Sequence, residues 1–216
     1  MSGARALPLS GVLAALALGS TGLISPPPPV AGAPAAEVVA YFGAHHVGLE
    51  IESVVLSVGL LLLLVFAATL SARLGGSAAL LAFGAATVLA ACTLVEVAAF
   101  QALAYRPDPD PVRAALLNDL QDFAFQVTSF PALLFLAANC HAILSTHLLP
   151  RWLGQAAAVA GVLQVVAWAS FFAPSGPLAA GGDPSIVSFL ALLAWIVACS
   201  LTMLFRGESV RIRAPT

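Results

Sequence analysis

The chain has 216 residues, of which 61% are hydrophobic and only 8% are charged. Soluble domains carry about 45–50% apolar and about 25% charged residues, so this composition excludes an ordinary water-soluble globule, and it also excludes a disordered chain. The formal net charge is −2 and no lysine is present, so the sequence offers no basic surface to nucleic acid and indicates an integral membrane protein.

Six windows are long and apolar enough to cross a bilayer, whose core of about 30 Å needs about 20 helical residues. Their hydrophobicity is continuous, whereas the strands of a β-barrel alternate, so the spans are predicted to be helical. In chain order they are residues 6–24, 53–72, 78–103, 114–144, 153–172 and 185–205. We therefore expect one all-α transmembrane bundle over residues 1–216, with outer loops at about 25–52, 104–113 and 173–184.

The first window has two interpretations. Arg5 precedes an apolar stretch that ends in small residues, a pattern that also fits a secretory signal peptide. The stretch is longer than the usual signal-peptide core of about 7–15 residues, which favours a retained helix. The bundle then has six helices, or five if residues 6–24 are a cleaved signal.

The arginines predict the orientation of the bundle, because cytoplasmic loops are enriched in basic residues. With the N-terminus inside, two arginines fall outside, Arg106 and Arg113. The cytoplasmic segments then hold Arg5, Arg73, Arg151, Arg206, Arg211 and Arg213. We expect a multi-pass protein of the bacterial inner or plasma membrane with both termini in the cytoplasm.

Glu96 is the charged residue that orientation does not explain. An ionisable side chain inside a span costs about 2.5–3.5 kcal/mol on insertion scales, so it needs an inward-facing partner or water. Glu96 lies in the outer half of the third window, well inside the apolar stretch. Its carboxyl group is expected to be neutral or hydrogen-bonded.

Polar residues also recur at helical spacing before the second window. If helix already begins near residue 45, one face carries His46, Glu50, Ser53 and Ser57. Glu52 falls on another face, so Glu50 and Glu52 cannot both point at one site from a regular helix.

The fourth window shows a similar stripe. Asp119, Asp122, Gln126 and Ser129 share one face near its outer end, and Pro131 is expected to kink the helix after them. We expect the polar groups of the second, third and fourth helices to converge in an outward-facing pocket. The alternative is that most of them are helix-entry residues at the water interface, where acids favour the helix N-terminus.

A convergent cluster would divide into two roles. The predicted catalytic groups are Glu96, Asp122 and Asp119, and the predicted ligand-binding residues are His46, Glu50, Gln126 and Ser53. Such a cluster suits an intramembrane acid–base enzyme on a lipid or isoprenoid, since paired carboxyls can act as acid and base.

Three alternatives remain open. The cluster would also suit a proton- or cation-coupled carrier working as an oligomer, and it would fit a non-catalytic membrane subunit or scaffold. A metal-dependent hydrolase would use His46, Glu50, Glu96 and Asp119, but the sequence has no HxxxH or HExxH motif. We therefore predict no metal and no cofactor. The expected partners are membrane lipid, a small hydrophobic ligand and a second copy of the chain.

The segment Leu149-Pro150-Arg151-Trp152-Leu153-Gly154 carries a resemblance to a family. It is similar to the LPRWLG-like turn of small bacterial polytopic membrane proteins of the DUF4386 type. The chain also resembles them in its Ala/Leu-rich helices and in the Pro/Gly-rich segment 175–184 before the last span. The resemblance implies the bundle fold and no functional residue.

Overall fold

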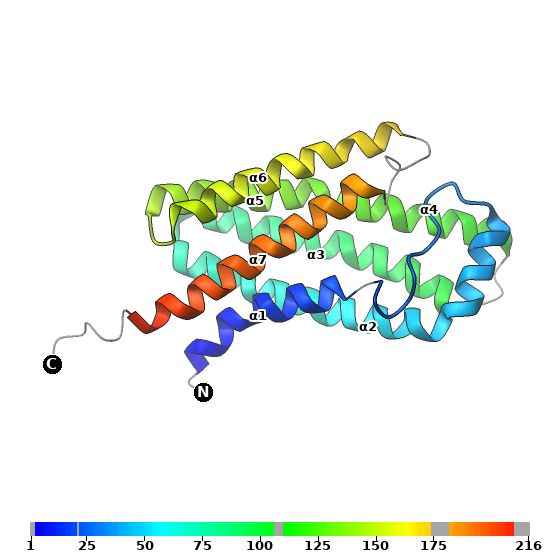
Figure 1. Cartoon of the computed structure of the whole chain (residues 1–216), viewed down its shortest axis with the longest axis horizontal. Helices are drawn as coiled ribbons and strands as arrows, with labels where there is room; N and C mark the ends of the chain where they lie inside the picture. Colours follow the sequence, from blue (N-terminus) through cyan, green and yellow to red (C-terminus); the bar gives the residue numbers. More distant parts are fainter. Residues whose placement is uncertain (1–2, 21, 106–109, 174–181, 210–216) are drawn as a thin grey trace.

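The computed structural model describes residues 3–20, 22–105, 110–173 and 182–209, and all regular elements within these ranges are helices. Figure 1 shows them lying along one long axis. The elements are α1 (Gly3–Gly19), α2 (Ala35–Leu74), α3 (Gly76–Tyr105), α4 (Pro111–Val127), α5 (Ser129–Thr146), α6 (Arg151–Ala167), the 3-10 helix η1 (Trp168–Phe172) and α7 (Asp183–Ser209).

Five helical segments of the described chain are long and apolar enough to cross a membrane, which confirms an all-α, multi-pass membrane bundle. They are Ala35–Leu74, Gly76–Tyr105, Pro111–Thr146, Arg151–Phe172 and Asp183–Phe205. The remaining predicted span, residues 6–24, corresponds to α1, whose apolar part, Leu7–Gly19, is shorter than the others.

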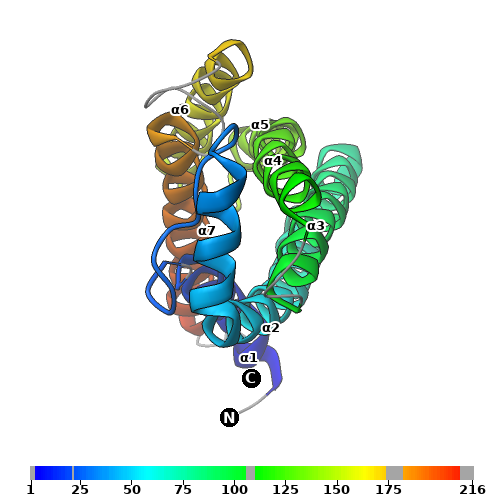
Figure 2. The same ribbon diagram turned by 90° about the vertical axis from the view of Figure 1, so that its right-hand side faces the viewer.

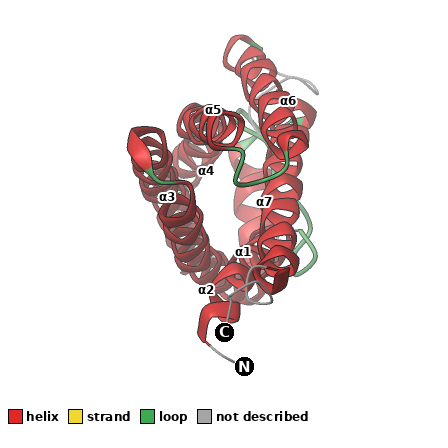
Figure 3. Ribbon diagram, turned by 90° about the vertical axis from the view of Figure 1, so that its left-hand side faces the viewer, coloured by secondary structure: helices red, strands yellow, loops and turns green. Residues whose placement is uncertain are grey.

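The helices form a closed ring. Each helix packs on the next, with α3 contacting both α4 and α5, and α7 returns to contact α1. Figures 2 and 3 show this ring from its two ends. The order along the chain is therefore also the order around the ring, as short connections between antiparallel helices favour.

Helix α1 is packed into the ring through small residues. A Cβ atom on Gly11 would lie 2.0 Å from Ser200 Oγ of α7, and one on Gly59 of α2 would lie 3.0 Å from Leu18 Cδ2. Such close approach is how helices associate in lipid, where apolar contact with lipid tails competes with contact between helices. Although α1 is short, it is part of the packed core.

The predicted loop 25–52 is helical from Ala35 onwards, which corrects the predicted start of the second helix. Pro34 occupies the N-cap position and Glu37 lies in the first turn, where an acid favours the helix N-terminus. At about 1.5 Å per residue, 40 residues of helix have a path length of about 60 Å, which exceeds the thickness of a bilayer core. Polar residues are therefore tolerated in the first turns, which bend away from the rest of α2 (Figure 1).

The fourth predicted span is interrupted before Pro131. Helix α4 ends at Val127 and α5 begins at Ser129, so Pro131 lies in the first turn of α5. A proline is tolerated there because its missing N–H would have no partner within the helix. The predicted span is therefore two successive helices: α4 carries the buried polar residues, and α5 is mostly apolar.

The two ends of the bundle differ. The start of α1, the end of α7, the turn at Gly75 and the turn after Thr146 lie at one end, which we call the termini end (Figure 1). Arg73 and Arg151 lie at this end, and Arg73 donates a hydrogen bond to the Met203 carbonyl of α7 at 3.3 Å. The connection between α1 and α2, described from residue 22 to 34 and called the strap below, lies at the opposite, strap end (Figure 1).

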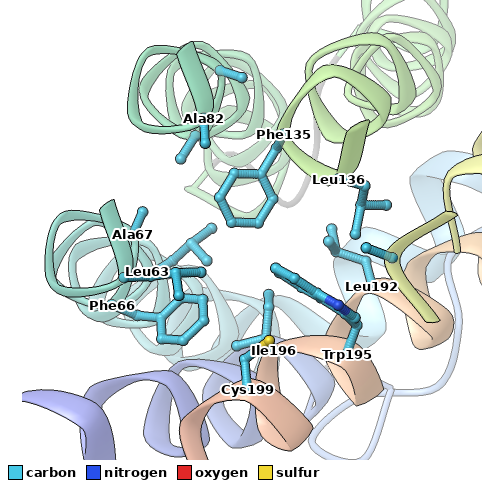
Figure 4. Close-up of a cluster of buried hydrophobic side chains, with 14 of the residues drawn as sticks. Leu63, Phe66, Ala67, Ala82, Phe135, Leu136, Leu192, Trp195, Ile196 and Cys199 are labelled. Atoms are coloured by element: carbon cyan, nitrogen blue, oxygen red, sulfur yellow. The ribbon is translucent and has the colours of Figure 1, made fainter. Parts of the chain in front are cut away.

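An apolar core fills the ring towards the termini end. Phe66, Phe135, Leu136 and Ile196 are at most 1% exposed, and Trp195 packs edge-to-face on Phe135 at 5.6 Å between ring centres (Figure 4). Trp195 also donates its indole N–H to the Leu153 carbonyl at 2.9 Å, so its polar group is satisfied. We call the side chains labelled in Figure 4 the apolar plug. They are Leu63, Phe66, Ala67, Ala82, Phe135, Leu136, Leu192, Trp195, Ile196 and Cys199.

Candidate functional site

A cavity of about 570 Å³ lies inside the ring and is lined by residues of α1 to α7. Leu63 and Ile196 of the apolar plug form its wall towards the termini end. Gly22, Pro27 and Val30 of the strap form its wall at the other end. The prediction placed a pocket between the second, third and fourth helices, whereas this cavity is lined by residues from the whole ring.

The described lining of the cavity is acidic. It contains four carboxyl side chains and no Arg, Lys or His. The four acids are Glu52 of α2, Glu96 of α3, Asp122 of α4 and Asp183 at the start of α7. A cavity with this composition disfavours anions and favours protons, cations or hydrogen-bond donors.

Glu96 and Asp122 form the centre of this acidic lining. They come from neighbouring helices and interact electrostatically. Asp122 is only 6% exposed and accepts a hydrogen bond from the backbone N–H of Ala31, yet its Oδ2 atom has no hydrogen-bond partner. Glu96 Oε2 is buried and has no partner either. Buried polar atoms are rarely left unpaired, so two such carboxyl oxygens mark a candidate binding site.

Other polar residues of the cavity wall are fully engaged in holding helices together. The Gln126 side chain donates to the Ala167 carbonyl and accepts from the Ser185 hydroxyl group, which joins α4 to α6 and α7. Gln164 of α6 donates to the Ser188 carbonyl of α7 at 2.9 Å. These amides satisfy buried backbone and hydroxyl groups, which is a structural role.

The strap is fixed to the ring by acidic and amide side chains. The N–H of Gly22 donates to Glu52 Oε1 at 3.2 Å, and that of Gly32 donates to Asp119 Oδ1 at 2.9 Å. Asn118 donates to the Pro29 carbonyl at 3.0 Å. Together with the bond from Ala31 to Asp122, these contacts hold the strap across the α2–α4 side of the cavity mouth.

The structure brings together three of the seven predicted site residues, because Glu96, Asp122 and Gln126 all line the cavity. Asp119 is not among the lining residues and holds the strap instead. Its position in the third turn of α4 leaves it within reach of a backbone segment 87 residues away in sequence.

The predicted ligand-binding residues of α2 also lie outside the cavity lining. His46 Nδ1 is 3.2 Å from the Gly43 carbonyl oxygen, and the Ser53 hydroxyl donates to the Leu49 carbonyl at 2.9 Å. Glu52 lines the cavity in place of Glu50. Helical periodicity showed that Glu50 and Glu52 cannot both face one site, and Glu50 was the predicted binding residue. The packing of the ring instead places Glu52 in the cavity wall.

Several cavity residues had no place in the predicted site. The predicted site does not include Gln121, which directly precedes Asp122 and whose Oε1 atom is buried without a partner. Gln164 and Ser185 come from the fifth and sixth spans. A polar residue in the middle of an apolar window was the available signal for Gln164, by the same reasoning that identified Glu96.

Among the described residues, no group of three His, Cys, Asp or Glu side chains is arranged to hold a metal ion. The four residues considered for a metal site do not share the cavity, since of them only Glu96 lines it.

Comparisons of the chain with models of protein families, with curated proteins and with solved structures found no significant match. The resemblance based on residues 149–154 stays a prediction. The candidate site rests on the geometry of this chain alone.

Proposed function

We propose that the cavity binds a small or lipid-like ligand and that Glu96, with Asp122 beside it, exchanges protons with that ligand. The observation that carries this proposal is the pair of unpartnered carboxyl oxygens in a cavity of about 570 Å³. Ligand pockets of about 300–1,000 Å³ are mostly apolar with a few convergent polar groups, and this cavity fits that description.

The two carboxyl groups have unlike surroundings. Asp122 accepts a backbone hydrogen bond from the strap although its Oδ2 atom has no partner, whereas the Glu96 carboxyl group has no hydrogen bond from any described residue. Neighbouring titratable groups in different environments can divide the roles of acid and base. In this proposal Glu96 is the proton-exchanging group and Asp122 assists it, while Asp119 acts indirectly by positioning the strap.

We place the termini end in the cytoplasm and the strap end outside, in the cell membrane of a bacterium. Arg73 and Arg151 lie at the termini end, and basic residues concentrate on the cytoplasmic side. The cavity then lies towards the outer surface. Attaching a cytoplasm-active reporter to the C-terminus should give activity, and activity only from a periplasm-active reporter would reverse this orientation.

The apolar plug favours binding over transport. A carrier must expose its site to both sides in turn, so Leu63, Phe135 and Ile196 would have to separate. The carrier alternative therefore requires a rearrangement of the best-packed part of the bundle, and it predicts an oligomer. A scaffold would need no cavity, so tight ligand binding would exclude that alternative.

The test is mass spectrometry of lipids and small molecules that copurify with the full chain, applied to wild type, Glu96→Gln and Glu50→Gln. We expect a specific molecule with wild type and with Glu50→Gln, whose carboxyl is outside the cavity lining. Glu96→Gln should purify with the same yield and lose that molecule. Equal retention by Glu96→Gln would exclude Glu96 as the binding group. Equal loss of yield for Glu96→Gln and Glu96→Leu would show a structural role instead.

A further inference from the structure

The unsatisfied polar atoms of the cavity-lining residues share one property: all are hydrogen-bond acceptors. They are Glu96 Oε2, Asp122 Oδ2 and Gln121 Oε1. Gln121 is independent of the acidic pair, because its amide oxygen accepts hydrogen bonds whatever the protonation state of its neighbours. It is also 6% exposed, so its missing partner is not supplied by bulk water.

Most donors of the same lining are already used, with the side-chain amide group of Gln121 as the exception. Gln126 and Gln164 donate to main-chain carbonyls of other helices, and Ser185 donates to Gln126. The remaining hydroxyl groups donate to main-chain carbonyls three or four residues earlier, Thr93 to Leu89, Thr128 to Phe125, Ser129 to Gln126 and Ser188 to Ser185. A ligand that enters this cavity therefore meets free acceptors and few free donors.

Charge points in the same direction. The described lining holds four acids and no basic residue, and an uncompensated carboxylate inside a membrane protein is costly unless a cation or proton accompanies it. A ligand that carries a positive charge and several N–H groups compensates the carboxylates and pairs with the free acceptors at once. A neutral ligand would supply only part of this, and an anion would add repulsion.

The rest of the lining is apolar and suits a compact hydrocarbon body. Leu56 and Leu60 of α2 face the same cavity as Phe125 of α4 and Phe189 of α7, and the two phenyl rings lie edge-to-face at 5.8 Å. Aromatic side chains close to an acidic group also suit a cation, through the negative face of the ring.

We propose that the ligand of this cavity is an organic amine: an ammonium head group bound by Glu96, Asp122 and Gln121, with an apolar body among the leucine and phenylalanine side chains. This inference rests on the proposed ligand-binding function and gives it a substrate class. Ammonium N–H groups would donate to the three acceptors, and the carboxylates would provide the countercharge.

The experiment compares three cage compounds of nearly equal size, 1-adamantanamine, 1-adamantanol and adamantane-1-carboxylate. Their binding to the full chain in neutral detergent is measured by isothermal titration and by thermal stabilisation. We expect the amine to bind about 10- to 100-fold more tightly than the alcohol, because the alcohol cannot form charge-assisted hydrogen bonds to the buried carboxylates. The carboxylate should bind weakest.

The variants separate this inference from the function on which it rests. Asp122→Asn and Gln121→Leu should each weaken amine binding more than alcohol binding, whereas Glu50→Gln should change neither. If the alcohol binds as tightly as the amine and both bind in the cavity, the amine class is wrong and the binding function stands. If none of the three compounds binds and nothing copurifies with the chain, both proposals are wrong.

Discussion

The two halves of the ring differ in the side chains that fill their interior. Towards the termini end, Phe66, Phe135 and Ile196 belong to one buried apolar cluster. Towards the strap end, Glu96, Asp122 and Gln126 occupy the corresponding interior positions around a cavity. Helices α2, α3, α5, α6 and α7 contribute buried residues to both halves, whereas α4 lines only the cavity, so the difference lies in the side chains and in the position of α4.

This contrast separates stability from function within one bundle. Helices in lipid are held together by close packing and interhelical hydrogen bonds, since burial from water drives little of their association. The apolar plug supplies close packing, and Gln126 and Gln164 supply hydrogen bonds between helices. Glu96 and Asp122 supply neither in full, because each leaves a buried oxygen unpaired. A buried ionisable residue that lowers stability and adds neither packing nor a complete set of hydrogen bonds is expected to serve binding.

The largest expected effect comes from truncating the apolar plug. Phe135→Ala should lower the free energy of unfolding by about 3–5 kcal/mol, because Phe135 is 1% exposed and its removal leaves a void. Leu134→Ala on the same helix is the control, since Leu134 is 44% exposed and faces lipid. Denaturation in mixed micelles measures both. Equal losses for the two variants would mean that the plug is not the stabilising half.

The next effect concerns the junction between α1 and the ring. Gly11→Ala places a Cβ atom 2.0 Å from Ser200 Oγ and 2.5 Å from Phe66 Cδ2, so we expect a loss of about 1–3 kcal/mol through overpacking. Gly84→Ala is the matched control, because nothing lies within 4 Å of a Cβ at that helical position. It should be neutral or slightly stabilising, since alanine favours helix.

The Gly11 variant also tests whether α1 is retained. If residues 6–24 were removed as a signal peptide, Gly11→Ala would leave the stability of the purified protein unchanged, and its N-terminal sequence would begin after α1. We expect N-terminal sequencing of purified wild type to start before Gly11. Partial rescue of Gly11→Ala by Ser200→Ala would locate the clash at the α1–α7 contact.

A smaller effect distinguishes the two glutamines on α4. Gln126→Leu leaves the Ala167 carbonyl and the Ser185 hydroxyl group without their partner and should cost about 1–2 kcal/mol. Gln121→Leu removes a buried oxygen that has no partner, so stability should be unchanged or increased. The same unfolding assay measures both. A larger loss for Gln121→Leu would contradict the division of the cavity wall into structural and binding groups.

The sequence predicted the features that depend on local composition. Glu96 stands out because an ionisable residue in an apolar window is expensive wherever the helix packs, and the shared face of Asp122 and Gln126 follows from helical periodicity. The all-α membrane bundle follows from the apolar windows in the same way.

The features that depend on tertiary contacts could not be predicted. Periodicity showed that Glu50 and Glu52 face different directions, but only the contacts of α2 with its neighbours decide which of them meets the cavity. The pairing of Gly32 with Asp119 joins residues 87 positions apart, so no local pattern reports it. Ser185 and Gln164 enter the cavity because α7 closes the ring, and the order of helices around a bundle is not encoded in any one span.

The smallest expected effect tests whether Asp119 belongs to the site or only holds the strap. Its contact with the Gly32 N–H is solvent-exposed, so Asp119→Ala should cost less than about 1 kcal/mol of global stability. The loss should be local: hydrogen exchange at Gly32 and its neighbours should become faster, because local openings report the weakest contacts. Asp119→Asn keeps an Oδ1 acceptor and should exchange as slowly as wild type. Both variants should retain the molecule that copurifies with the chain, since the described cavity lining does not include Asp119. Loss of that molecule in Asp119→Asn, with the strap still protected, would return Asp119 to the catalytic role that the sequence suggested.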